Sequence, residues 1–213
     1  MQGLQDELLI HISNALVAED FLALEPKLPA LIEATTQKII EDLAAFASRD
    51  PATQGRLELI LQNRCSFKAV MYYRLAHWIW QLPPEAGHDY RLIAERVSHQ
   101  GKLISGAHIH PAAQIGQRFV LEHGYGTIIG PTCRIGDDCH LLCAVILDTQ
   151  LAAHDPEGHR HPRLGNNVEI GAGARLIGYV TVDDNVLVSP ACVITHTLPT
   201  GTWLKVVSST EAQ

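Results

Sequence analysis

The sequence predicts an α+β protein, in which an α-helical domain over residues 1–104 is followed by a parallel β-helix over residues 105–199. Apolar residues recur every three or four positions in the first part, and branched aliphatic residues recur every six positions in the second. This second period fits neither a helix nor a long strand. It is typical of a triangular coil whose three faces take about six residues each. The six-residue series comprises Ile109, Ile115, Leu121, Ile129, Ile135, Leu141, Leu147, Leu164, Ile170, Leu176, Val182, Val188 and Ile194.

The first part contains several segments with the spacing of amphipathic helices. Asp50-Pro51 fits a cap followed by a first helical position, because proline lacks an N–H only where none is needed. Pro83-Pro84 ends a segment that is rich in aromatic residues. The expected helices cover residues 4–16, 21–32, 38–47, 65–82 and 89–103.

The coil is predicted to have a stacked core and polar corners. Small or apolar residues stand four positions after most members of the series, and Gly, Asn and Asp, which suit tight turns, stand close to it. Two insertions break the period: two residues after Leu121, and a polar, His-rich loop at 148–163. Loops expelled from a regular scaffold often carry function. Residues 200–213 are expected to form a tail.

Composition limits the partners of the chain. The formal net charge is −7 with no cluster of Lys or Arg, so neither nucleic acid nor a membrane is an expected partner. No apolar run approaches the ~18 residues of a membrane span. Three of the five cysteines (Cys133, Cys139 and Cys192) fall on core positions. We expect buried thiols in a reducing compartment, and hence a cytoplasmic protein.

Two groups of residues could carry chemistry. His123 follows Glu122 where the period slips, and a histidine beside a carboxylate is a natural general base near neutral pH. The alternative is a surface histidine beside an acid. Arg160-His161 in the long loop could clamp a carboxylate, because guanidinium binds carboxylates in a bidentate fork. The alternative there is a solvated loop.

A metal site is a further alternative. His154, Asp155, His159 and His161 have a spacing that suits metal ligands, and so does the pair of His108 and His110 at the start of the coil. These residues would fit a metal-dependent lyase of the β-helix type. Since no three histidines are clearly placed on facing turns, we predict no metal.

Several motifs resemble those of the serine acetyltransferase family, within the hexapeptide-repeat acyltransferase superfamily. The patterns R-D-P, Y-R-x-A-H-W and R-H-P are specific to this family, and I-G-A-G-A is common to the superfamily. The resemblance covers about residues 40 to 200 in collinear order. It is carried by residues 48–51, 72–80, 109–116, 121–126, 160–165 and 170–174.

The resemblance implies a left-handed β-helix assembled as a trimer or a dimer of trimers, with acetyl-CoA as co-substrate between neighbouring coils. It implies acetyl transfer to the hydroxyl of L-serine, a step of cysteine synthesis, with His123 as the base. Arg160 and His161 match the residues that hold the carboxylate of the amino acid, and Asp50 matches the acid that binds its amino group. The edge that binds CoA would include Gly171, Ala172 and Lys205.

Four positions depart from the family pattern. His108 stands where an Asp orients the catalytic histidine, and Glu122, which we also expect to bind substrate, replaces a shorter Asp. The expected catalytic residues are His123, Glu122 and His108. Because His108 has no carboxylate, we expect either that Glu122 orients His123 in its place or that His123 is a weaker base. The segments 148–151 and 205–208 replace Gly-Gly-Thr-Gly and Gly-Val-Pro-Ala at the CoA edge.

These departures leave alternatives open. The chain could use another acyl donor or an amino-acid-like acceptor, or it could be a catalytically silent regulatory homologue. The family's extended, Ile-terminated tail has no counterpart here. A complex with the O-acetylserine sulfhydrylase is therefore not predicted.

Overall fold

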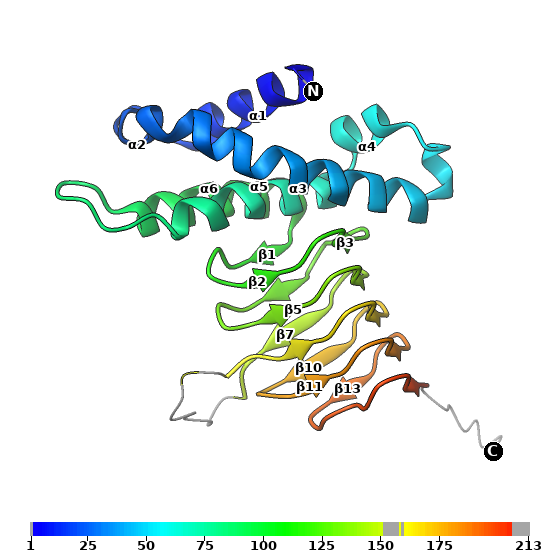
Figure 1. Ribbon diagram of the computed structural model, residues 1–213. Coiled ribbons are helices and arrows are strands. Elements are labelled where there is room, and N and C mark those ends of the chain that lie inside the picture. Colours follow the sequence, from blue (N-terminus) through cyan, green and yellow to red (C-terminus); the bar gives the residue numbers. More distant parts are fainter. Residues whose placement is uncertain (1, 151–157, 159, 206–213) are drawn as a thin grey trace, which may run out of the picture.

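The computed structural model describes residues 2–150, 158 and 160–205, and Figure 1 shows a layer of helices lying across one end of a three-sided coil. Within that part of the chain, no helix is both long enough and apolar enough to cross a membrane. The helical elements are α1 (Gln2–Ala15), α2 (Ala18–Leu24), η1 (Glu25–Lys27), α3 (Leu28–Arg49), η2 (Pro51–Thr53), α4 (Leu57–Asn63), α5 (Cys65–Trp80) and α6 (Tyr90–Ser105).

Local sequence explains where these helices begin and end. The side chain of Asp50 accepts a hydrogen bond from the backbone N–H of Ala52 (3.0 Å), so that it caps η2 as predicted. Asp89 caps α6 in the same way, and Gly106 ends α6 in the left-handed conformation with φ 73°. The prediction of separate helices at 21–32 and 38–47 was wrong. α3 runs unbroken from Leu28 to Arg49, because no Gly or Pro interrupts its interior.

The coil is a parallel β-helix with three sheets, as predicted, and every pairing between its named strands is parallel. The first sheet contains β1 (His108–Ile109), β4 (Ile128–Ile129), β7 (Ile146–Asp148), β10 (Arg175–Ile177) and β13 (Val193–Ile194). The second contains β2 (Gln114–Ile115), β5 (Arg134–Ile135), β8 (Arg163–Leu164) and β11 (Thr181–Val182). The third contains β3 (Val120–Leu121), β6 (His140–Leu141), β9 (Glu169–Ile170), β12 (Leu187–Val188) and β14 (Trp203–Leu204).

The core of the coil is the six-residue series. All thirteen members of the series are buried, with at most 8% of any residue exposed. Cys133, Cys139 and Cys192 are buried free thiols, as expected. Burial raises the pKa of Cys133 to about 12 and that of Cys139 to about 11, so both remain protonated at neutral pH.

The turns between sheets form three edges, which we name after residues on them. The His123 edge joins the third sheet to the first (122–127, 142–145, 171–174 and 189–192). The His161 edge joins the first to the second (110–113, 130–133, 149–150, 160–162 and 178–180). The Asp137 edge joins the second to the third (116–119, 136–139, 165–168 and 183–186).

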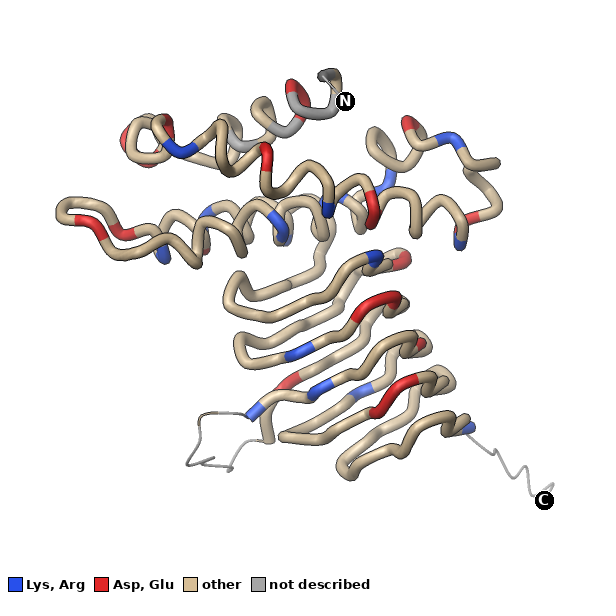
Figure 2. The backbone as a smooth tube through the Cα atoms, in the orientation of Figure 1, with Lys and Arg blue, Asp and Glu red and all other residues tan. Residues whose placement is uncertain are grey.

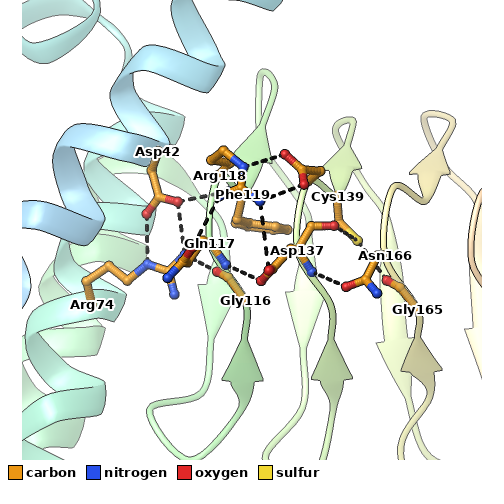
Figure 3. Close-up of polar contacts among 11 residues, drawn as sticks. Asp42, Arg74, Gly116, Gln117, Arg118, Phe119, Asp137, Cys139, Gly165 and Asn166 are labelled. Carbon is orange, nitrogen blue, oxygen red and sulfur yellow. Dashed lines mark hydrogen bonds and ion pairs between the residues drawn. The ribbon is translucent and has the colours of Figure 1, made fainter.

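Side chains link successive turns along the Asp137 edge (Figure 3). The carboxylate of Asp137 accepts a hydrogen bond from Gln117 N (2.8 Å), and the side-chain oxygen of Asn166 accepts one from Asp137 N (2.8 Å). Asp184 accepts from Asn166 N (2.6 Å) in the same way. Gly136 leaves room for this ladder, because a Cβ there would lie 2.6 Å from the side-chain oxygen of Asn166.

A buried ion pair attaches the helical layer to the first turn of the coil (Figure 3). Arg74 on α5 binds the Asp42 carboxylate on α3 through Nε (2.7 Å) and Nη2 (3.0 Å), and its Nη1 donates to the carbonyl of Ile115 (2.7 Å). Phe119 N donates to Asp42 (2.9 Å). Burial raises the pKa of Asp42, and both Arg74 and the N–H of Phe119 act to lower it. This clamp holds the C-terminal half of α3 against the first turn of the coil.

Candidate active site

His123 lies on an irregular turn. Its backbone is left-handed with φ 59°, as is that of Gly124 with φ 68°, and these two residues form the insertion that breaks the period. The turn is closed by a hydrogen bond from Gly124 N to Glu122 O (2.7 Å). As a result the His123 side chain points away from the core and is 73% exposed. A residue in this position can meet a substrate.

A pocket of about 540 Å³ lies between the helical layer and this turn. Its lining includes Glu122 and His123 from the coil and Asp50, Arg64 and Ser66 from the helical layer. The structure therefore brings Asp50, Glu122 and His123 together, although Asp50 is more than 70 positions away in the sequence. The clamp between Asp42 and Arg74 accounts for this, because Asp50 directly follows α3.

The Asp50 carboxylate is held on both oxygens. One oxygen accepts the N–H of Ala52, and the other lies 2.9 Å from Nε of Arg64. These contacts fix its direction in the pocket, and Arg64 shares its charge. The sequence did not single out Arg64, which becomes a neighbour only because the chain turns back between η2 and α5.

The Glu122 carboxylate lies between two histidines. One oxygen is 3.7 Å from Nε2 of His123, and the other is 2.9 Å from Nε2 of His140 on β6. His140 is buried, and its Nδ1 lies 3.2 Å from Nη1 of Arg49 at the end of α3. Burial, and then Arg49, lower the pKa of His140. Sequence reasoning missed both residues. The signal in the sequence was that His140 precedes Leu141 just as Val120 precedes Leu121, and the structure pairs His140 with Val120 across β6 and β3.

His108 begins β1, next to the turn that carries His123. Its pKa is lowered by burial and then by Lys102. The hydrogen bonds and ion pairs found among the described residues do not join His108 to His123. The acid beside His123 is Glu122.

Arg160 and His161 lie on the His161 edge. The hydroxyl oxygen of Thr132 accepts from the backbone N–H groups of both residues (3.2 Å each) and lies 2.7 Å from Nδ1 of His161. Nε2 of His161 is 3.5 Å from Asp148. His161 is buried, which lowers its pKa, whereas Arg160 is exposed.

One chain does not bring the two groups together. His123 lies on the turn between the third and first sheets, and His161 lies on the turn between the first and second, so the first sheet separates them. Of the suggested metal ligands, His154, Asp155 and His159 lie outside the described residues. Among the residues that are described, no three His, Cys, Asp or Glu side chains come together as metal ligands.

The residues expected to bind CoA lie on later turns of the coil than His123. Gly171 and Ala172 are on the His123 edge, and Lys205 follows the last strand of the third sheet. Ala172 lies in the turn between β9 and β10, where its carbonyl accepts from Ala191 N (2.9 Å). Gly171 faces the next turn, since a Cβ there would lie 2.7 Å from the carbonyl carbon of Ser189. Lys205 follows β14, and its ammonium lies 3.4 Å from the centre of the Trp203 ring.

Similarity to individual known proteins identifies the family of this chain, although no model of a known protein family matches it. The chain is 36% identical over 159 residues to the serine acetyltransferase of Helicobacter pylori (strain 26695), and the alignment covers 75% of this chain and 87% of that protein. It is 35% identical over 160 residues to the serine acetyltransferase of Synechococcus elongatus, over 74% of this chain but only 61% of that relative's length.

A solved structure gives the same result. The serine acetyltransferase of Brucella abortus strain S19, in complex with coenzyme A, superposes with a TM-score of 0.79 at 26% identity, over 94% of this chain and 78% of that one. At 94% coverage the match includes both the helical layer and the three-sided coil. The chain belongs to the serine acetyltransferase family.

Proposed function

We propose that this protein transfers the acetyl group of acetyl-CoA to the hydroxyl of L-serine, with His123 as general base. The observation that carries the proposal is the pocket in which an exposed histidine, a carboxylate beside it and a second carboxylate from the helical layer face the same space. The family relationship supplies the substrates, and these three residues supply the proton transfer and a site for the amino group.

Each step of the proposed acetyl transfer can be assigned to one of these three residues. His123 takes the proton of the serine hydroxyl as its oxygen attacks the thioester carbonyl carbon. When the tetrahedral intermediate collapses, the C–S bond breaks and the CoA sulfur receives that proton from His123. Glu122, 3.7 Å from Nε2, stabilises the imidazolium between these steps. Asp50 binds the substrate ammonium group.

We infer that the site is completed by a second chain in a trimer. Arg160 and His161 suit the carboxylate of the amino acid, but they lie on a different edge from His123. If the His161 edge of one chain packs against the His123 edge of its neighbour, the two groups face each other and CoA lies between the coils. Three-fold symmetry would form three such sites. The coil itself is taken to be left-handed, as the family resemblance implies.

Release of CoA thiol in the presence of L-serine tests the assignment of the base. His123→Ala is expected to lower kcat by about 10²- to 10⁴-fold, because that is the usual contribution of a general base. The same substitution should leave the thermal unfolding midpoint unchanged, because the His123 side chain is exposed. Activity that survives the substitution would remove His123 from this role. A panel of acyl-CoAs against serine and homoserine should give the highest kcat/KM for acetyl-CoA with serine.

Mixing two inactive variants tests the shared site. His123→Ala and Arg160→Ala chains, unfolded together and refolded, would form mixed trimers in which about a quarter of the sites have both residues intact. We expect recovery of about a quarter of the wild-type activity. Each variant refolded alone is the control. No recovery, from mixed trimers of the correct mass, would show that both residues act within one chain.

A further inference from the structure

We propose that His140, held by Arg49, is a positioning residue that fixes the Glu122 carboxylate beside His123. The inference rests on the proposed function, because it concerns the acid that supports the general base. In the family pattern an Asp at the position of His108 orients the catalytic histidine. This chain has no carboxylate there, and Glu122, held by His140, takes over the orienting role.

The contacts determine which way His140 donates. An arginine guanidinium has donors only, so Nδ1 of His140, 3.2 Å from Nη1 of Arg49, must accept. The ring proton of a neutral His140 then lies on Nε2, and it is donated to Oε2 of Glu122 at 2.9 Å. Arg49 thus selects the one neutral form of the ring that can hold Glu122.

The charges around the ring keep it in this form. His140 is only 6% exposed, and burial lowers its pKa. A proton on Nδ1 would also point at the Arg49 guanidinium. Glu122 and Glu169 act in the other direction, but Glu169 is itself 3.6 Å from Arg49. A neutral His140 donates a hydrogen bond without competing with His123 for the serine proton.

This support has a specific task. Glu122 has one more rotatable bond than the aspartate that the family pattern has at this position, so an unrestrained side chain would spend less time near His123. With Oε2 held by His140, the other oxygen remains 3.7 Å from Nε2 of His123. The bond therefore places negative charge where the imidazolium forms.

Three variants separate this role from packing. His140→Phe keeps an aromatic ring but has no donor, and we expect kcat to fall about tenfold with both KM values little changed, because the interaction acts on the protonated base. His140→Gln can donate from its amide and is expected to retain most of the wild-type kcat. His196→Phe, at an exposed histidine of the coil, is the matched control and should behave as wild type.

The outcomes decide the proposal. Wild-type kcat in His140→Phe would overturn it, and so would a loss in His140→Gln as large as that in His140→Phe, because the effect would then be one of packing. If wild-type protein released no thiol with serine and acetyl-CoA, the proposed function would fail instead.

Long-range ¹H–¹⁵N NMR of protein labelled at histidine gives an independent answer that needs no activity. The His140 signals, identified by their loss in His140→Gln, should report a neutral ring protonated on Nε2 at pH 7. A ring protonated on Nδ1, or on both nitrogens, would contradict the assignment even in an active enzyme.

Discussion

The two histidines proposed for the site have opposite surroundings. His123 is 73% exposed on an inserted turn, whereas only 3% of the His161 side chain is exposed, and the latter is held by Thr132. Because the Thr132 oxygen already accepts two backbone N–H groups, its hydroxyl proton is available to Nδ1 of His161. The ring then carries its own proton on Nε2. An exposed ring can exchange protons with a substrate, whereas the buried one presents a fixed donor.

Thr132→Val should therefore weaken binding of serine. The substitution keeps the shape of the side chain but leaves the N–H groups of Arg160 and His161 without their acceptor, and we expect the KM for serine to rise about tenfold, with a smaller change in the KM for acetyl-CoA. Steady-state kinetics of thiol release measures both values. Thr132→Ser, which keeps the hydroxyl, is the control. An unchanged serine KM in Thr132→Val would show that this hydroxyl does not position the pair.

At the residue scale, the sequence predicted the positions but not their partners. His123 and Asp50 line one pocket. The period of six and the cap at Asp50 are local signals that placed each residue at a turn, but only the family resemblance related the two residues to each other. His140 and Arg49 escaped notice. Their contact depends on where α3 ends relative to the coil, and that is fixed by a buried ion pair between distant segments rather than by any local pattern.

At the scale of elements, the coil could be predicted almost completely and the helices less well. Each aliphatic residue of the series is buried because the same register repeats in every turn, so one correct placement determines the others. The break expected within α3 was wrong because apolar spacing alone does not mark a helix end. β14 lies where a tail was expected, and it extends the third sheet by pairing with β12.

Gly136→Ala tests the packing between successive turns. The added Cβ would lie 2.5 Å from the carbonyl oxygen of Gly165 and 2.6 Å from the side-chain oxygen of Asn166, so the backbone of the next turn would have to shift. We expect a loss of about 2 kcal/mol in the free energy of unfolding, or about 6 °C in the unfolding midpoint. Gly3→Ala, in α1 with no atom within 4 Å of the new Cβ, is the control and should not lower the midpoint. Equal midpoints for wild type and Gly136→Ala would contradict this packing.

At the scale of the whole molecule, buried and half-buried histidines link stability to pH. In six of them the pKa is lowered, and burial is the largest cause in each: His11, His77, His108, His110, His140 and His161. Below pH about 6.5 the unfolded chain binds more protons at these positions than the folded chain. The contribution of these histidines to the free energy of unfolding is therefore fully present above about pH 6.5. It is lost as the pH falls below that value and through the lowered pKa values of the folded state.

The unfolding midpoint is accordingly expected to fall between pH 7 and pH 5.5. Differential scanning calorimetry at constant ionic strength measures it. His77→Gln removes one of the six groups and should make this decline shallower. In the folded chain Nδ1 of His77 lies 2.8 Å from the carbonyl oxygen of Pro111. Exposed His196, replaced by Gln, should leave the decline unchanged. A midpoint that stays constant or rises on acidification would exclude this linkage.

The ladder on the Asp137 edge also limits how such a chain can change in length. Its links join residues separated by 20, 29 and 18 positions, and the two longer separations contain the insertions after Leu121 and at 148–163, yet all three bonds are between 2.6 and 2.8 Å long. An insertion on the Asp137 edge would break a link, whereas one on either other edge leaves all of them in place. Duplication or deletion of a whole turn would preserve them as well. New loops, and with them new specificity, are therefore free to arise along two of the three edges.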